Sequence, residues 1–210
     1  MKRAILLTAL FTSSILFINA QESIRETLKF GIKGGATMSN VYDSEGEEFD
    51  ADPKLGYTAG LNLEIPIGKF LGLHPEVLLT QKGFKGSGSL LGTDYSYKRT
   101  TTFLEVPVLV ALKPTDVISI VAGPQFAYLL QEKNQFDSSP LSYEQEEEFE
   151  QDNIRKNLLG FVGGINLNFN HITVGGRIGF DFQKNRGDGT ADTPRYKNVW
   201  GQLTIGYRFF

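Results

Sequence analysis

The chain has 210 residues, with 21 basic and 24 acidic side chains, two histidines and no cysteine. A net charge of −3 without a basic stripe argues against nucleic acid as a partner, because phosphates require clustered cations. The lack of cysteine excludes disulfides, thiolate metal sites and a lipid anchor on an amino-terminal cysteine.

Residues 1–20 have the three regions of a cleaved secretory signal. Lys2 and Arg3 form the positive n-region, an apolar stretch follows, and Ala20 closes a cleavage site before Gln21. The alternative is a retained membrane anchor, but the apolar run is near the lower limit for spanning ~30 Å of hydrocarbon. We therefore expect export, and a mature domain of residues 21–210 with no transmembrane helix.

The mature chain then repeats one pattern, in which apolar residues alternate with small or polar ones. This period of two is typical of a strand with two unlike faces. The stretches that carry it are residues 28–41, 54–68, 70–86, 95–113, 117–131, 155–170, 172–183 and 198–210.

The connections between these stretches alternate between long and short. The short ones are Gly68-Lys69, residues 113–116 and Asn170-His171. The long ones are residues 43–53, 87–94, 132–153 and 184–195, of which we expect 132–153 to be the longest unstructured stretch. This alternation predicts an eight-stranded antiparallel up-and-down transmembrane β-barrel with short periplasmic turns and longer external loops.

Ionisable side chains in the middle of strands indicate which face points inward. On a lipid-facing surface each Arg or Lys would cost roughly 2–4 kcal/mol at the midplane. We therefore predict a luminal polar network formed by Lys33, Glu64, Glu76, Lys82, Glu105, Arg177, Asp181 and Arg208. Three carboxylates on neighbouring strands need cations nearby, and we expect Arg177 to be the central partner.

Aromatic residues fall mostly near the ends of the predicted strands, which suits girdles at the two membrane interfaces. They are Tyr57, Phe84, Phe103, Tyr128, Phe161, Phe180, Phe182, Trp200, Tyr207 and Phe209.

The third long connection is strongly acidic. Its carboxylates include Glu144, Glu146, Glu147, Glu148, Glu150 and Asp152. Such a run is typical of a solvated external loop. The alternative is bridging by divalent cations to anionic lipopolysaccharide, since these ions favour carboxylate oxygens. The tripeptide Arg186-Gly187-Asp188 in the next connection is too short a motif to indicate receptor binding.

Catalysis has little support in the sequence. Hydrolysis near the external rim would need a nucleophile beside a base. The two histidines, His74 and His171, both fall at the end of the short turns. We therefore predict no enzyme activity, no catalytic residue, no metal site and no cofactor.

Several segments resemble the PorT-like outer-membrane β-barrel family, whose members are porin-like. The segments are FGIKGGATMSN, LGYTAGLNLEIPIGKFLGLHPEVLLTQKGFK, TTFLEVPVLVALKP and ISIVAGPQFAYLL. The resemblance implies an eight-stranded barrel in the bacterial cell outer membrane, with lipid and lipopolysaccharide around it. It supplies no catalytic residues. We expect the barrel assembly machinery to recognise the C-terminal strand, although the apolar row that ends at Phe209 is one residue out of phase with the terminal Phe210.

The expected function is that of a small structural or interaction protein of the outer membrane with a side-chain-filled lumen. A narrow porin or ion path is the first alternative, although a barrel of eight strands leaves little room for it. A soluble periplasmic lipocalin-like barrel is the second, because its strands also alternate but turn the apolar face inward.

Overall fold

The computed structural model describes residues 27–42, 51–90, 93–138, 141–147, 156–184 and 196–209. The predicted signal of residues 1–20 and the tripeptide at 186–188 lie outside them. Nine strands cover most of this part of the chain: β1 (Lys29–Tyr42), β2 (Asp52–Pro66), β3 (Leu71–Leu90), β4 (Thr93–Leu112), β5 (Ile118–Ser138), β6 (Leu141–Glu147), β7 (Asn157–Phe169), β8 (Ile172–Asp181) and β9 (Lys197–Arg208).

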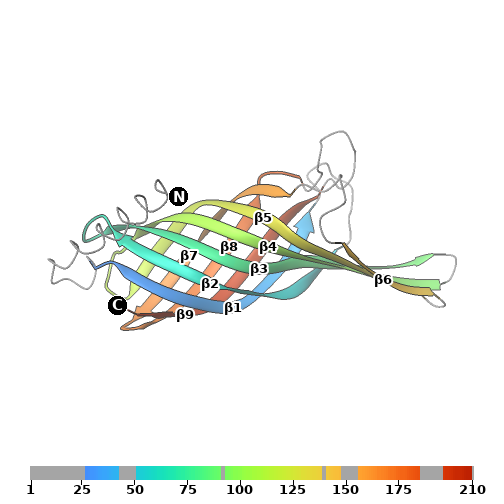
Figure 1. The fold of residues 1–210 in the computed structure, drawn as a ribbon, viewed down its shortest axis with the longest axis horizontal. Helices are drawn as coiled ribbons and strands as arrows, with labels where there is room; N and C mark the ends of the chain where they lie inside the picture. The colour runs from blue at the N-terminus through green and yellow to red at the C-terminus, as the bar shows by residue number, and fades with distance from the viewer. Residues whose placement is uncertain are drawn as a thin grey trace, which may run out of the picture.

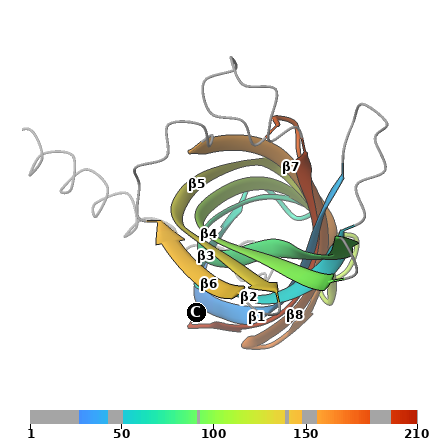
Figure 2. The ribbon, with the colours of Figure 1, turned by 90° about the vertical axis from the view of Figure 1, so that its right-hand side faces the viewer.

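Eight of these strands close into a barrel. The order along the sheet is β4-β3-β2-β1-β9-β8-β7-β5-β6, and an additional pairing of β4 with β5 closes the ring. Every pairing is antiparallel, and Figure 2 shows the ring along the barrel axis. The predicted eight-stranded antiparallel barrel is confirmed. The described ranges contain no helix that is long and apolar enough to cross a membrane.

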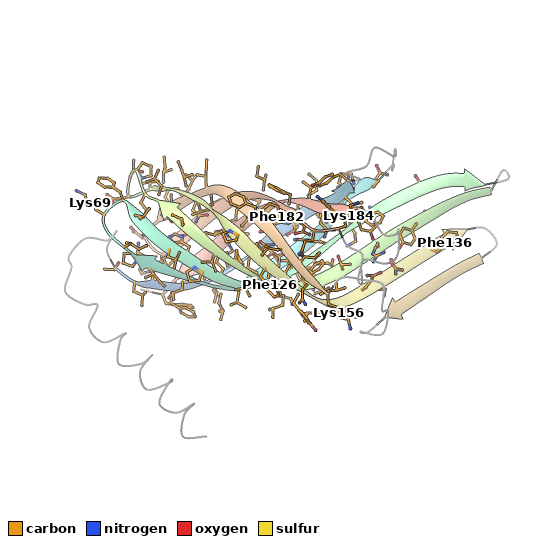
Figure 3. The ribbon with its side chains drawn as sticks, turned by 90° about the horizontal axis from the view of Figure 1, so that it is seen from above. Lys69, Phe126, Phe136, Lys156, Phe182 and Lys184 are labelled. Carbon is orange, nitrogen blue, oxygen red and sulfur yellow. The ribbon has the colours of Figure 1, made fainter. Side chains whose placement is uncertain are left out.

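The two faces of each strand divide as the alternation predicted. On β1, Ile32 and Met38 are 47% and 59% exposed, whereas Thr37 is fully buried. Figure 3 shows Phe126 and Phe182 on the outside of the barrel. An apolar exterior with a polar interior is the arrangement of a membrane barrel, and it is the reverse of a soluble lipocalin-like barrel.

We use "short-turn end" for the end of the barrel that carries residues 67–70, 113–117 and 170–171. Asn170 adopts a positive φ of 39°, which lets a two-residue turn join β7 to β8. The C-terminus of β9 lies at this end as well, where the amide of Phe209 donates to the carbonyl of Phe30 (Figure 1).

The opposite end differs from the prediction, because two connections expected as loops are strands. Residues 87–94 belong largely to β3 and β4, and much of 132–153 forms the end of β5 and all of β6. The ends of β3 to β6 pair into a sheet that projects beyond the barrel (Figure 1). Outside the hydrocarbon both faces of a strand are wet, so these segments lack the apolar alternation used to recognise strands.

The position of the acidic residues also differs from the prediction. Glu144, Glu146 and Glu147 belong to β6 and pair through their backbones with β5, so they are not part of an unstructured loop. Glu148, Glu150 and Asp152 lie outside the described residues.

A bulge in β5 separates the barrel from the projecting sheet. Thr102 pairs with Gln131, whereas the next residue, Phe103, pairs with Leu129, so Leu130 is the extra residue. Below the bulge β5 pairs with β7, and above it β5 pairs with β6. The extra residue reverses the alternation, and Glu132 is therefore buried.

The prediction is wrong for three of the ten aromatic residues that it assigned to the girdles. Phe84, Phe103 and Trp200 are 3%, 3% and 4% exposed and point into the barrel. The indole of Trp200 occupies the space above Gly179, where a Cβ atom would come within 2.2 Å of the ring. A glycine on the neighbouring strand thus makes room for a large ring in a narrow lumen.

Candidate functional site in the barrel lumen

The eight charged residues of the predicted luminal network are all buried. They are 0% to 9% exposed, and they come from β1, β2, β3, β4, β8 and β9. With Arg99 and Glu132 they form four layers of ion pairs, which we call tiers and number from the short-turn end. No tier is formed by neighbours in sequence, so the geometry depends on closure of the barrel.

The first tier joins Arg208 to Glu64 at 3.8 Å between Nη1 and Oε2. Arg208 is also anchored to the β7–β8 turn. Its Nη2 donates to the carbonyl of Asn170 at 2.6 Å, and its Nη1 donates to Oδ1 of Asn168 at 3.3 Å. The last residue of β9 is thereby tied to the neighbouring hairpin.

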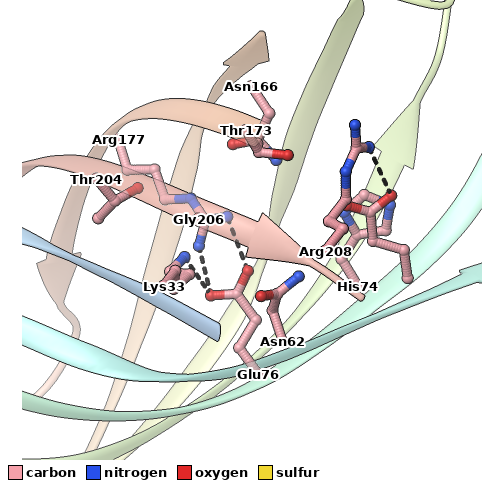
Figure 4. A pocket seen from close by; sticks show the side chains of 11 residues that line it. Lys33, Asn62, His74, Glu76, Asn166, Thr173, Arg177, Thr204, Gly206 and Arg208 are labelled. Carbon is pink, nitrogen blue, oxygen red and sulfur yellow. Dashed lines mark hydrogen bonds and ion pairs between the residues drawn. The ribbon is translucent and has the colours of Figure 1, made fainter. Parts of the chain in front are cut away.

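The second tier is centred on Glu76 of β3. Arg177 of β8 donates to both carboxylate oxygens, at 2.7 and 2.8 Å, and Lys33 of β1 donates to Oε2 at 2.7 Å (Figure 4). The paired, planar geometry is the strong form of an arginine–carboxylate contact. It links strands on different sides of the ring.

The third tier is the most completely buried. Lys82 and Glu105 form an ion pair at 2.5 Å, with side chains 1% and 0% exposed. The Lys82 ammonium also lies 4.6 Å from the ring centroid of Trp200 and 5.5 Å from that of Phe103. Asp181 accepts a hydrogen bond of 2.6 Å from Asn198 beside them. Charge and aromatic rings fill the lumen together here.

The fourth tier was missed by the sequence analysis, which assigned Glu132 to the acidic loop. Arg99 donates to Glu132 at 2.6 Å, and Asn134 donates to the same carboxylate at 2.8 Å. Tyr97 in turn donates to Asn134 at 2.8 Å. The bulge at Leu130 places Glu132 inside, and a one-residue break in alternation is the signal that could have located it.

Tyr196 covers this tier just before β9 begins and outside the membrane-spanning strands. Its ring packs edge-on against Phe84 at 5.2 Å, and Arg99 lies 5.6 Å from its centroid. Burial raises the pKa of the Tyr196 hydroxyl above its usual value, although the Arg99 charge acts in the opposite direction.

The carboxylates therefore occupy separate tiers. Glu64, Glu76 and Glu105 were expected to cluster, yet each has its own cationic partner. His171 stacks on Tyr207 at the short-turn end, and His74 is 3% exposed inside the lumen. Within the described ranges no group of three or more metal-ligating residues is placed to hold an ion.

Comparisons with known proteins agree with this architecture. The sequence model of a family described as "outer membrane protein beta-barrel domain" matches residues 19–185. No curated protein matches the chain.

Three solved structures illustrate the similarity. The Ail attachment invasion locus protein of Yersinia pestis, in complex with the heparin analogue sucrose octasulfate, is 16% identical; the match has a TM-score of 0.47 and covers 87% of this chain and 99% of that one. Neisserial surface protein A is 12% identical, with a TM-score of 0.46 and coverage of 86% and 97%. OprG of Pseudomonas aeruginosa is 14% identical, with a TM-score of 0.37 and coverage of 86% and 95%.

The family match extends over most of the chain, and the lipid-facing exterior and polar lumen agree with it. The chain therefore belongs to the family of outer membrane protein beta-barrel domains and resides in the bacterial outer membrane.

Proposed function

We propose that the chain is a structural or interaction protein whose barrel is closed to solutes and has no catalytic role. In this proposal it belongs to the PorT-like branch of porin-like barrels, and residues 1–20 direct its export in a Gram-negative cell. The observation that carries the proposal is the third tier. Lys82 and Glu105 are almost fully buried, and the Lys82 ammonium lies over the rings of Phe103 and Trp200. The interior of an eight-stranded barrel has room for side chains alone.

The absence of an enzymatic role is supported by the position of the histidines. Within the described residues both lie toward the short-turn end, far along the barrel from the projecting sheet. The carboxylates Glu76 and Glu105 are engaged in ion pairs with lysine or arginine. Neither histidine has the nucleophile and base arrangement that hydrolysis requires.

The surface available to partners is the projecting sheet of β3 to β6. In this sheet the strands continue to pair beyond the lipid-facing part of the barrel, and β6 takes no part in closing the ring. The acidic residues of β6 and of the segment that follows are our candidates for contact with lipopolysaccharide through divalent cations. The C-terminal strand β9 is the candidate for recognition by the assembly machinery.

Planar bilayers test the closed lumen against the alternative of a narrow ion path. We expect the purified barrel to insert without discrete conductance steps. A double substitution of Lys82→Ala and Trp200→Ala removes two side chains of the third tier, and we expect it to produce steps. Unitary steps from the unaltered protein that scale with salt concentration would overturn the proposal.

A further inference from the structure

A polar pocket lies inside the lumen between the first and second tiers. The cavity itself is small, with about 20 Å³ open to the centre of a water-sized ligand, and it is partly open to solvent. Its charged or ionisable lining consists of Lys33, Glu64, His74, Glu76, Arg177 and Arg208 (Figure 4). The buried residues of the third tier lie on its far side from the short-turn end, and we therefore take the short-turn end as the side of access.

Buried charge is distributed unevenly along the lumen of the described chain. The short-turn half contains four buried cations, Lys29, Lys33, Arg177 and Arg208, against two buried carboxylates, Glu64 and Glu76. The other half is balanced, with Lys54, Lys82 and Arg99 against Glu105, Asp181 and Glu132. Lys113 and Asp116, at the turn between β4 and β5, both take part in further interactions and are not counted on either side.

An excess of buried positive charge is costly in an environment of low dielectric. Burying a charge is tolerated when it is paired and hydrogen-bonded, and an uncompensated charge is strongly unfavourable. A bound anion supplies the missing compensation. The charge distribution thus favours an anion in the short-turn half of the lumen.

Hydrogen-bond donors provide a second and independent observation. Nε of Arg177 and Nε of Arg208 are buried, and no acceptor among the described residues reaches either atom. The same is true of Nε2 of His74, which can also donate. These three residues line the pocket and are 6%, 4% and 3% exposed. Unsatisfied buried donors of this kind are rare in native proteins.

We propose that the pocket binds a small oxyanion, of the phosphate or carboxylate class, that enters from the short-turn end. Arginine N–H groups suit such oxygens because they donate in a fixed planar geometry. The site goes beyond the proposed function, since it concerns the periplasmic mouth and is independent of the projecting sheet. Failure of the bilayer prediction would leave it intact, because an anion pocket can lie within either a closed or a conducting barrel.

The experiment is a titration of the folded, full-length barrel in detergent with inorganic phosphate at constant ionic strength. Phosphate binding is followed by the ³¹P resonance, and its effect on stability by thermal unfolding detected through Trp200, the single tryptophan. We expect a saturable rise in melting temperature, because a ligand bound only to the folded state stabilises it. Acetate as competitor distinguishes the two classes: displacement of phosphate by acetate indicates a site selective for carboxylates, and resistance to it indicates one selective for phosphates.

Variants assign the binding to the pocket. Arg208→Gln removes one donor, and Asn62→Leu fills the lining with an apolar group while leaving all the ion pairs in place. We expect each to weaken phosphate binding at least tenfold. Lys69→Gln, which removes a cation at the same end but outside the lumen, should bind as the unaltered protein does.

Two results would overturn the inference. One is a response that rises linearly with phosphate and follows ionic strength alone. The other is equal affinity in the Asn62→Leu and Lys69→Gln variants. Should Arg208→Gln fail to fold, the Asn62→Leu comparison still decides the question.

Discussion

Glu76 of β3 holds two cations, Lys33 from β1 and Arg177 from β8, which lies across the ring from β3. Lys33 and Arg177 both lie 2.7 Å from its Oε2, and the arginine also contacts Oε1. A carboxylate that is 4% exposed depends on these partners, because its own desolvation is unfavourable. Removing one partner of such a buried ion pair strongly destabilises the fold, whereas replacing the whole pair by apolar side chains is often neutral.

Removal of the arginine tests this dependence. We expect Arg177→Ala to lower the free energy of unfolding by about 3 kcal/mol, at the lower end of the range for breaking a buried pair because Lys33 remains. The measurement is the urea midpoint of the barrel in detergent, with Lys69→Ala as a surface control. An unchanged midpoint would show that Arg177 is not the central partner.

Tyr196 should make the barrel sensitive to alkaline pH. Its pKa is raised by burial, so above pH ~10 the unfolded chain ionises this group while the folded chain keeps it neutral. Stability from this residue is therefore complete below that pH and declines as the pH rises. We expect Tyr196→Phe to flatten the decline between pH 9 and about 11.5 in unfolding curves. Parallel curves for the two proteins would argue against a buried hydroxyl.

At the scale of elements, a glycine of β8 and a tryptophan of β9 pack against each other. Gly179 lies directly opposite Trp200 in the register, and the indole lies where a side chain would project. The same ring contacts the Lys82 ammonium in the third tier. The glycine thus positions an aromatic ring that helps to fill the lumen.

Adding a single methyl group should disturb this arrangement. We expect Gly179→Ala to displace the indole and to cost about 1–3 kcal/mol, the usual range for overpacking a filled interior. The emission spectrum of Trp200 and the unfolding midpoint report the two effects. Gly176→Ala, on the same strand, is the matched control, because no atom lies within 4 Å of the position that its new Cβ would take. Equal behaviour of both variants would contradict the packing argument.

At the scale of the whole molecule, the barrel and the projecting sheet are separate in their pairing. Closure uses β1 with β9 and β4 with β5, and β6 has no part in it. Replacement of residues 135–152 by a short glycine-serine linker should leave the ring intact. We expect the shortened protein to retain a heat-dependent shift on a denaturing gel, as closed barrels do. Loss of the shift would mean that the projecting sheet is required for closure.

Much of this architecture is predictable from the sequence, for a physical reason. Lipid on one side and a crowded polar lumen on the other impose the period-two pattern, so the faces of Ile32 and Lys33 follow from alternation alone. The extent of β3 to β6 could not be predicted, because water surrounds both faces there. The pairing of Glu76 with Lys33 and Arg177 also depends on barrel closure, which local sequence does not encode, and Glu132 was hidden by a one-residue bulge.

The bulge at Leu130 has a consequence for how such a chain can change over generations. On the barrel side of the bulge, the register of the closed ring fixes the pairing of β5 with β7. One inserted residue there would turn every following side chain to the opposite face. Beyond the bulge, β5 pairs with β6 in an open sheet that has no closure condition to satisfy. The outer hairpins are therefore free to lengthen, shorten or diverge in steps of a residue pair, while the membrane-embedded wall stays constant.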